Sequence, residues 1–107
     1  MISRNGRRMT LSGPVTLANV AEVLQEGSRH LNADRRRLDE GVSVIDLGGV
    51  TEMDSALLAL LLAWLRDARR RDRKLEFSNP PASLRTIARL YGVEDLLPVA
   101  REAAASH

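Results

Sequence analysis

The sequence contains no cysteine, and its aromatic residues number one Phe, one Trp and one Tyr in 107 residues. The absence of cysteine excludes a disulfide framework and a thiolate metal site, and it is compatible with a reducing compartment. So few aromatic rings leave no stacking platform for single-stranded nucleic acid. The formal net charge is only +2, which also argues against a nucleic-acid partner.

Long hydrophobic runs are missing as well. The longest uninterrupted apolar stretch is Ala56–Leu65, whereas a membrane-spanning helix needs about 20 residues. Residues 1–10 are polar and basic and lack the apolar segment of a signal peptide. We therefore expect a cytoplasmic protein without direct membrane insertion. Its 44% hydrophobic and 28% charged residues are typical of a globular domain.

No arrangement of residues predicts an enzyme, a metal site or a cofactor. The two histidines, His30 and His107, have no neighbours at the spacing of a metal site or a catalytic triad. Asp46 and Asp54 flank a predicted loop after a strand, where ligands bind in open α/β sheets, so a nucleotide pocket is one alternative. Gly48-Gly49 lacks the lysine and hydroxyl residue of a phosphate-binding loop, which weakens that alternative.

The N-terminal part predicts a β-hairpin followed by a helix. Asn5-Gly6 is typical of a type I′ turn and would join a strand over 1–4 to a strand over 7–12, which Gly13-Pro14 would end. Thr16 would cap the helix. Its apolar stripe would consist of Leu17, Val20, Ala21, Leu24 and Leu31.

The rest of the chain predicts alternating strands and helices. A strand over 42–47 would be broken by Gly48-Gly49, and a helix would start at Asp54-Ser55, with either residue as its N-cap. A strand over 75–77 precedes the last helix, which Gly92 would end. The stripe of that helix would be Leu84, Ile87, Ala88 and Tyr91. This order predicts one α/β domain over 1–107, with a core of about 7–98 and a loosely held C-terminal tail.

The helix predicted over 56–71 has two different sides. Its large side chains occupy an arc of about 200° on a helical wheel and would fill the core: Leu57, Leu58, Leu60, Leu61, Leu62, Trp64 and Leu65. The other side holds Ser55, Ala56, Ala59, Ala63, Arg66 and Arg70. Small residues let another backbone approach closely, and arginines suit the rim of an interface. The alternative is that alanine is simply the best helix former at exposed positions.

These segments resemble the signature of the STAS domain family. The similarity lies in Val44–Leu47, in Met53–Ser55 and in the leucine-rich helix, and it covers about residues 9–98. The resemblance implies the STAS (SpoIIAA-like) α/β fold, a mixed sheet with an N-terminal hairpin and helices packed on the sheet. Within the family the chain most resembles the MlaB-like members, because of Asp54–Leu62 and Ile87–Pro98.

The resemblance to MlaB-like members implies a function as well as a fold. Those members are cytoplasmic subunits of Mla phospholipid ABC transporters, so the chain would bind, and regulate or stabilise, the transporter ATPase. That partner would hold it at the inner membrane. The residues expected to contact the partner are Asp54, Ser55, Ala56, Ala59, Ala63 and Arg66. The same small-residue face could also form a homodimer.

A second branch of the family implies a different partner. Anti-sigma factor antagonists bind an anti-sigma factor kinase and typically carry Asp-Ser-Ser/Thr-Gly, in which the second hydroxyl residue is phosphorylated. Here that position is Ala56, and Leu57 replaces the glycine, so phosphorylation at the usual position is excluded. Ser55 is then either a modification site or a helix N-cap, and we favour the cap.

Overall fold

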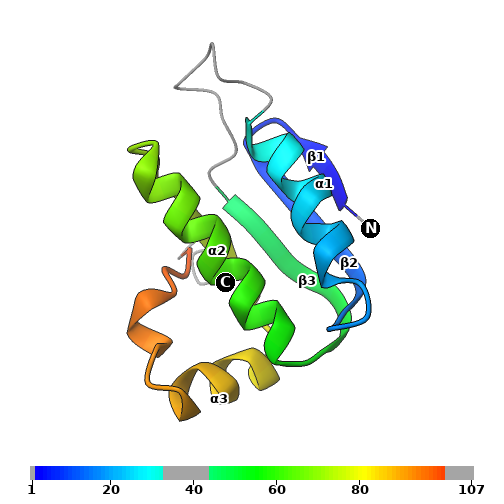
Figure 1. Ribbon diagram of the computed structural model, residues 1–107, viewed down its shortest axis with the longest axis vertical. Helices are drawn as coiled ribbons and strands as arrows, with labels where there is room; N and C mark the ends of the chain where they lie inside the picture. The colour runs from blue at the N-terminus through cyan, green and yellow to red at the C-terminus, as the bar shows by residue number, and fades with distance from the viewer. Residues whose placement is uncertain (1, 33–43, 101–107) are drawn as a thin grey trace, which may run out of the picture.

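A computed structural model of the chain describes residues 2–32 and 44–100, except for the side chain of Asn32 (Figure 1). Its elements are β1 Ile2–Asn5, β2 Arg8–Val15, α1 Val20–Asn32, β3 Val44–Met53, α2 Ser55–Arg70, β4 Glu76–Ser78, α3 Ala82–Leu90 and the 3-10 helix η1 Glu94–Leu96. The predicted order of hairpin, helix, strand, helix, strand and helix is confirmed.

The four strands form one mixed sheet in the order β1-β2-β3-β4. The β1–β2 pair is antiparallel, while the β2–β3 and β3–β4 pairs are parallel. Beyond β4, Val99 makes a parallel bridge to Phe77, and the Ala100 N–H donates to the Phe77 carbonyl at 2.7 Å. The chain is thus held to the sheet up to Ala100. The rest of the predicted loose tail, 101–107, lies outside the described residues.

The helices cover one face of the sheet, and the other face is polar. Figure 1 shows α1 and α2 running side by side over the strands, with α3 near the start of α2. The buried face consists of alternating apolar residues: Met9, Leu11, Ile45, Leu47 and Phe77. The neighbouring positions Arg8, Thr10 and Asp46 point to the opposite face. The core therefore lies entirely between the sheet and the helices.

The predicted hairpin is confirmed, but its turn lies one residue further along. Asn5 pairs with Arg8, so the central turn residues are Gly6 and Arg7 rather than Asn5 and Gly6. Gly6 has a φ of +63° and occupies the first central position. This arrangement is typical of a type II′ turn, which needs glycine there, and not of the expected type I′ turn.

Gly13-Pro14 and Gly48-Gly49, each expected to end a strand, lie inside strands. β2 continues through Gly13-Pro14 to Val15, and β3 continues through Gly48-Gly49 to Met53. A Cβ at position 49 would lie 2.9 Å from the Leu11 carbonyl oxygen, so glycine permits a close approach of β2 and β3. The shifts of register near these residues indicate bulges rather than strand ends.

The first helix begins later than its apolar pattern predicts. Residues 16–19 form a turn, because the Asn19 side chain accepts from the Thr16 N–H and donates to the Pro14 carbonyl. Leu17 therefore lies outside α1 and is 79% exposed. The Thr16 hydroxyl accepts from the Ala18 N–H within this turn, so it does not cap the helix.

The last helix follows its prediction except at its end. Leu84 and Ala88 are buried as expected, but Tyr91 is the C-cap residue and is 61% exposed. Gly92 has a φ of +72° and follows the cap, as predicted. The Val93 N–H donates to the Ala88 carbonyl at 2.8 Å and the Gly92 N–H to the Arg89 carbonyl at 3.0 Å. These bonds form a Schellman motif, which turns Tyr91 away from the stripe.

The contact between α1 and α2 leads to a stability prediction. A Cβ at Gly27 would overlap the ring of Trp64, which is 1% exposed. Gly27→Ala should lower the free energy of unfolding by about 1–3 kcal/mol through overpacking, although alanine is the better helix former. Urea unfolding followed by Trp64 fluorescence measures the change, with the exposed Gln25→Ala as control. An unchanged or higher unfolding midpoint for Gly27→Ala would contradict this packing.

Candidate functional site

Asp54 joins two segments at the junction of β3 and α2. Its Oδ1 accepts from the Ala56 N–H at 2.8 Å, and its Oδ2 accepts from the Leu17 N–H at 3.0 Å. Asp54 is extended, with a φ of −135°, and is the N-cap residue of α2. The interpretation of Ser55 as the cap is therefore wrong, and the Ser55 side chain is exposed instead.

The turn over 16–19 lies beside the start of α2 because the strands that precede the two segments are paired. Val15, the last residue of β2, pairs with Met53, the last residue of β3. The bond from Leu17 to Asp54 then places an exposed leucine next to Ser55. The apolar pattern predicts Leu17 in a buried helical stripe, whereas it is exposed. Its place at the site depends on the Asn19 turn, which the apolar pattern does not show.

The outward side of α2 is the other part of the site. Figure 1 shows α2 between α1 and α3 on one side of the sheet. Ser55, Ala59 and Arg66 are exposed and Ala63 is half-buried, and we call these four residues the outer α2 face. Together with Asp54 and Leu17, it forms a surface of small side chains with one exposed leucine and one cation. Such a surface can contact another protein closely.

The structure corrects two parts of the predicted helix pattern. Ala56 is only 9% exposed, so its side chain is not on the outer α2 face. It follows Ser55 by one residue, about 100° around the helix, which turns it inward. Leu62 and Leu65, expected in the core, are only half-buried at its edge.

Asp46 belongs to a separate polar cluster. Its Oδ1 accepts from the Gly48 N–H at 2.8 Å and from Asn79 Nδ2 at 3.1 Å. Its Oδ2 forms an ion pair with Arg8 at 3.1 Å, and Arg8 also donates to the Ser78 hydroxyl. Burial alone would raise the pKa of Asp46, but the hydrogen bonds from Gly48, Asn79 and Arg8 outweigh it and hold the pKa below 3.8.

These contacts also bear on the alternative of a nucleotide pocket. Asp46 and Asp54 do not flank a loop, because residues 48–53 continue β3. Asp46 already accepts hydrogen bonds from one backbone N–H and two side chains, and Asp54 accepts from two backbone N–H groups. Within 2–32 and 44–100, no group of three or more His, Cys, Asp or Glu residues could hold a metal ion. In the same part of the chain, no helix has the length and apolar character needed to cross a bilayer.

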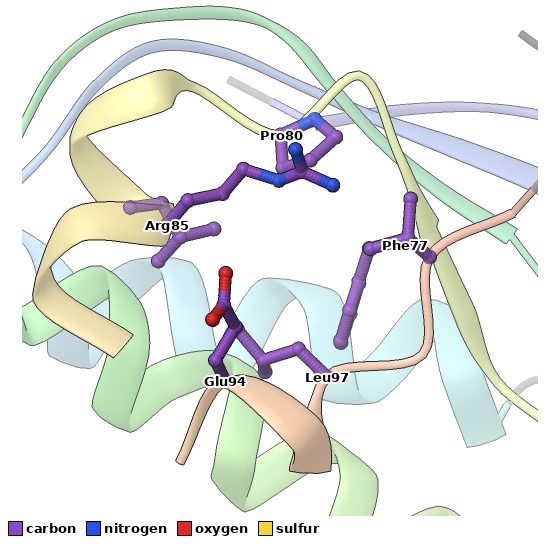
Figure 2. A pocket seen from close by; sticks show the side chains of 7 residues that line it. Phe77, Pro80, Arg85, Glu94 and Leu97 are labelled. Carbon is purple, nitrogen blue, oxygen red and sulfur yellow. The ribbon is translucent and has the colours of Figure 1, made fainter. Parts of the chain in front are cut away.

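A small cavity lies between β4, α3 and η1. Its volume is about 170 Å³. It is lined by Phe77, Pro80, Leu84, Arg85, Glu94, Leu97 and Val99. Figure 2 shows the Arg85 side chain along one side of the cavity and the Glu94 carboxylate pointing into it from the other. Sequence reasoning missed this cavity because residues from three separate elements line it.

Comparisons with known proteins decide the family. A family model described as the MlaB STAS domain matches residues 2–98. The chain belongs to this STAS domain family. The STAS domain described here has a mixed sheet with helices on one face, as the resemblance implied, so the predicted family and fold are confirmed. No curated protein matches the chain.

Two solved structures are similar to this STAS domain. One is the anti-sigma factor antagonist SpoIIAA in its unphosphorylated form, and the other is the Bacillus cell fate determinant SpoIIAA in the phosphorylated form. Each has a TM-score of 0.64 and 18% sequence identity over 98% of this chain, covering 90% and 94% of the SpoIIAA chains respectively. At this identity the likeness shows the fold alone.

The two hydrogen bonds of Asp54 predict the effect of removing its carboxylate. Asp54→Ala should lower the free energy of unfolding by about 1–2 kcal/mol, because α2 loses its cap and the Leu17 N–H loses its acceptor. Asp54→Asn keeps one carbonyl acceptor and should cost less. Urea unfolding of the three proteins gives the comparison, and equal stability of all three would show that Asp54 does not hold the site together.

The lowered pKa of Asp46 predicts a pH dependence. Because the folded-state pKa lies below 3.8, the Asp46 contacts stabilise the domain fully above that value. This stabilisation is lost as the pH falls through the folded-state pKa. As the pH falls below 3.8, the free energy of unfolding should therefore fall more steeply in the unmodified protein than in Asp46→Asn. Identical slopes in acid unfolding titrations would contradict the assignment.

Proposed function

We propose that this STAS domain is a non-enzymatic adaptor subunit. In this proposal it binds the cytoplasmic ATPase of an Mla-type phospholipid ABC transporter and regulates or stabilises that ATPase. The match to the MlaB family model over residues 2–98 supports this assignment. The adaptor would be cytoplasmic and would lie at the inner membrane through its partner, without inserting into the bilayer.

The observation that carries the proposal is the exposure of Ser55 and Ala59 on α2, whose N-cap residue Asp54 also binds the Leu17 N–H. Both small residues are exposed on the outer α2 face, and the Leu17 N–H donates to the Asp54 carboxylate at the start of α2. Small side chains allow a partner helix or loop to approach the backbone of α2 closely, and Leu17 offers an apolar anchor. Arg66 lies about two turns beyond Ala59, at the rim of this surface.

In the mechanism we propose, the domain acts on the ATPase by binding beside it. A rigid domain that binds one conformation of the ATPase more tightly than another shifts the ATPase toward the first conformation. The size of that shift is limited by the difference between the two affinities. The proposed mechanism contains no catalytic step.

A second candidate function is that of an anti-sigma factor antagonist that binds an anti-sigma factor kinase. The exposed hydroxyl of Ser55 favours it, because a kinase could reach this side chain. Ala56, at the usual phosphorylation position, has no hydroxyl and is buried. Incubation with the kinase and ATP followed by mass spectrometry separates the two functions, since phosphate on Ser55 would favour the antagonist.

The ATPase interface is tested by placing a large cation on the outer α2 face. Ala59→Arg should abolish binding to the purified ATPase subunit, raising Kd by about 100-fold or more, because a long side chain at the centre of the surface prevents close approach. Isothermal titration calorimetry measures the affinity, and Trp64 fluorescence checks that the fold is kept.

The matched control is Gln25→Arg, which adds the same charge at an exposed position of α1. It should bind the ATPase as the unmodified protein does. Unchanged affinity of Ala59→Arg would contradict the interface. A dimer of the domain that Ala59→Arg dissociates, without any binding of the ATPase, would assign the outer α2 face to self-association instead.

A further inference from the structure

A groove lies between α2 and η1, next to the outer α2 face. It has a volume of about 240 Å³ and is lined by Leu62, Leu65, Arg66, Arg69 and Leu96. Leu62 and Leu65 are half-buried and pack against the core, while Leu96 is 53% exposed. Scattered exposed leucines need no explanation, but a contiguous apolar surface with a polar border is typical of an interaction site.

The arginines at this groove have no partner in the described part of the chain. Arg66 and Arg69 line the groove, and their exposed side chains form no hydrogen bond or ion pair with any residue in 2–32 or 44–100. The single acidic residue of α2, Asp67, pairs with Arg71 at 3.3 Å. The helix dipole favours cations in the last turn, but it does not account for Arg66, which lies a turn earlier beside Leu62.

The groove and the outer α2 face form one continuous stripe. Positions 55, 59, 62, 66 and 69 follow each other at spacings of three and four, so their side chains line up along the helix. The stripe is about 21 Å long at 1.5 Å per residue. Small side chains come first, Leu62 follows, and Arg66 and Arg69 come last. A segment lying along α2 would meet these surfaces in that order.

We infer that the groove binds an acidic amphipathic segment of the protein partner. An apolar side chain of that segment enters between Leu62, Leu65 and Leu96, and carboxylates one turn away pair with Arg66 and Arg69. The inference rests on the proposed function, because it assigns the chemistry of the segment that the ATPase presents. Charge complementarity supports this kind of segment. Its acidic residues would pair with the unpaired arginines, and its large apolar side chains would contact the apolar floor of the groove.

An anionic membrane would also attract arginines, but the groove suits it less well. The two arginines lie beside an apolar floor inside a groove rather than on a flat face. A concave site of this size also accommodates a side chain better than a flat lipid surface.

The test uses the purified ATPase subunit and a double substitution, Arg66→Glu with Arg69→Glu. At low salt the Kd should rise by about tenfold or more, and the affinity should lose most of its dependence on NaCl concentration. The matched control is Arg29→Glu with Arg85→Glu, which changes the net charge equally at exposed, unpaired positions of α1 and α3. The control should stay within about threefold of the unmodified protein, because distant exposed charges are screened.

A third variant tests the apolar part of the groove. Leu96→Ser removes the exposed leucine without changing the charge. It should weaken binding by about fivefold and leave the salt dependence as it is in the unmodified protein. Unchanged affinity of Leu96→Ser would contradict the entry of an apolar side chain.

The remaining outcomes separate this inference from the proposed function. If the Arg66 and Arg69 substitutions leave affinity and salt dependence unchanged while Ala59→Arg still abolishes binding, the inference is overturned and the proposed function stands. If the Arg66 and Arg69 substitutions abolish binding to vesicles of anionic phospholipid and leave the ATPase affinity unchanged, the groove binds lipid and the inference is again overturned. If the unmodified protein does not bind the ATPase at all, the proposed function fails together with the inference.

Discussion

The carboxylate of Asp54 links the two segments of the candidate site that come from different parts of the chain. One oxygen accepts from the Ala56 N–H at the start of α2, and the other from the Leu17 N–H, 37 residues earlier in the sequence. Both donors are backbone groups, so the frame of the site does not depend on which side chains stand at positions 17, 55 and 59. Those positions can then determine which partner is recognised without altering the fold.

This frame is rigid because the inward side of α2 is packed into the core. Leu57, Leu61 and Trp64 are almost completely buried between the helices and the sheet. The ring of Trp64 occupies the space that Gly27 leaves open in α1, and its Nε1–H donates to the Ser28 hydroxyl at 3.3 Å. A helix held in this way presents its outward residues in one arrangement, which is what a positional adaptor needs.

Much of the fold could be predicted because the hydrophobic pattern and the turn residues agree. The alternation of strands and helices follows from short apolar runs separated by amphipathic segments with apolar residues at helical spacing. The strand ends could not be predicted, because a glycine pair suits a turn as well as a close approach of two strands. Gly48-Gly49 illustrates this, since β3 passes through it next to β2. Likewise, a stripe that includes Leu17 does not reveal that Asn19 turns the chain before the helix starts.

Part of the candidate site could also be predicted from the hydrophobic pattern. A helical wheel separates the leucine side of α2 from its small-residue side, and the exposure of Ser55 and Ala59 follows that separation. The wheel does not show which neighbouring elements pack on each side. It therefore predicts an outward Ala56, which is in fact buried, and it cannot predict the groove beside Leu96, which depends on where η1 packs.

Photo-crosslinking measures the contact between the outer α2 face and the transporter ATPase directly. A photoreactive amino acid in place of Ala59 should form a covalent adduct with the ATPase subunit on irradiation, while the same amino acid in place of Gln25 should not. An adduct from position 25 with none from position 59 would contradict the account, because the ATPase would then bind a different surface.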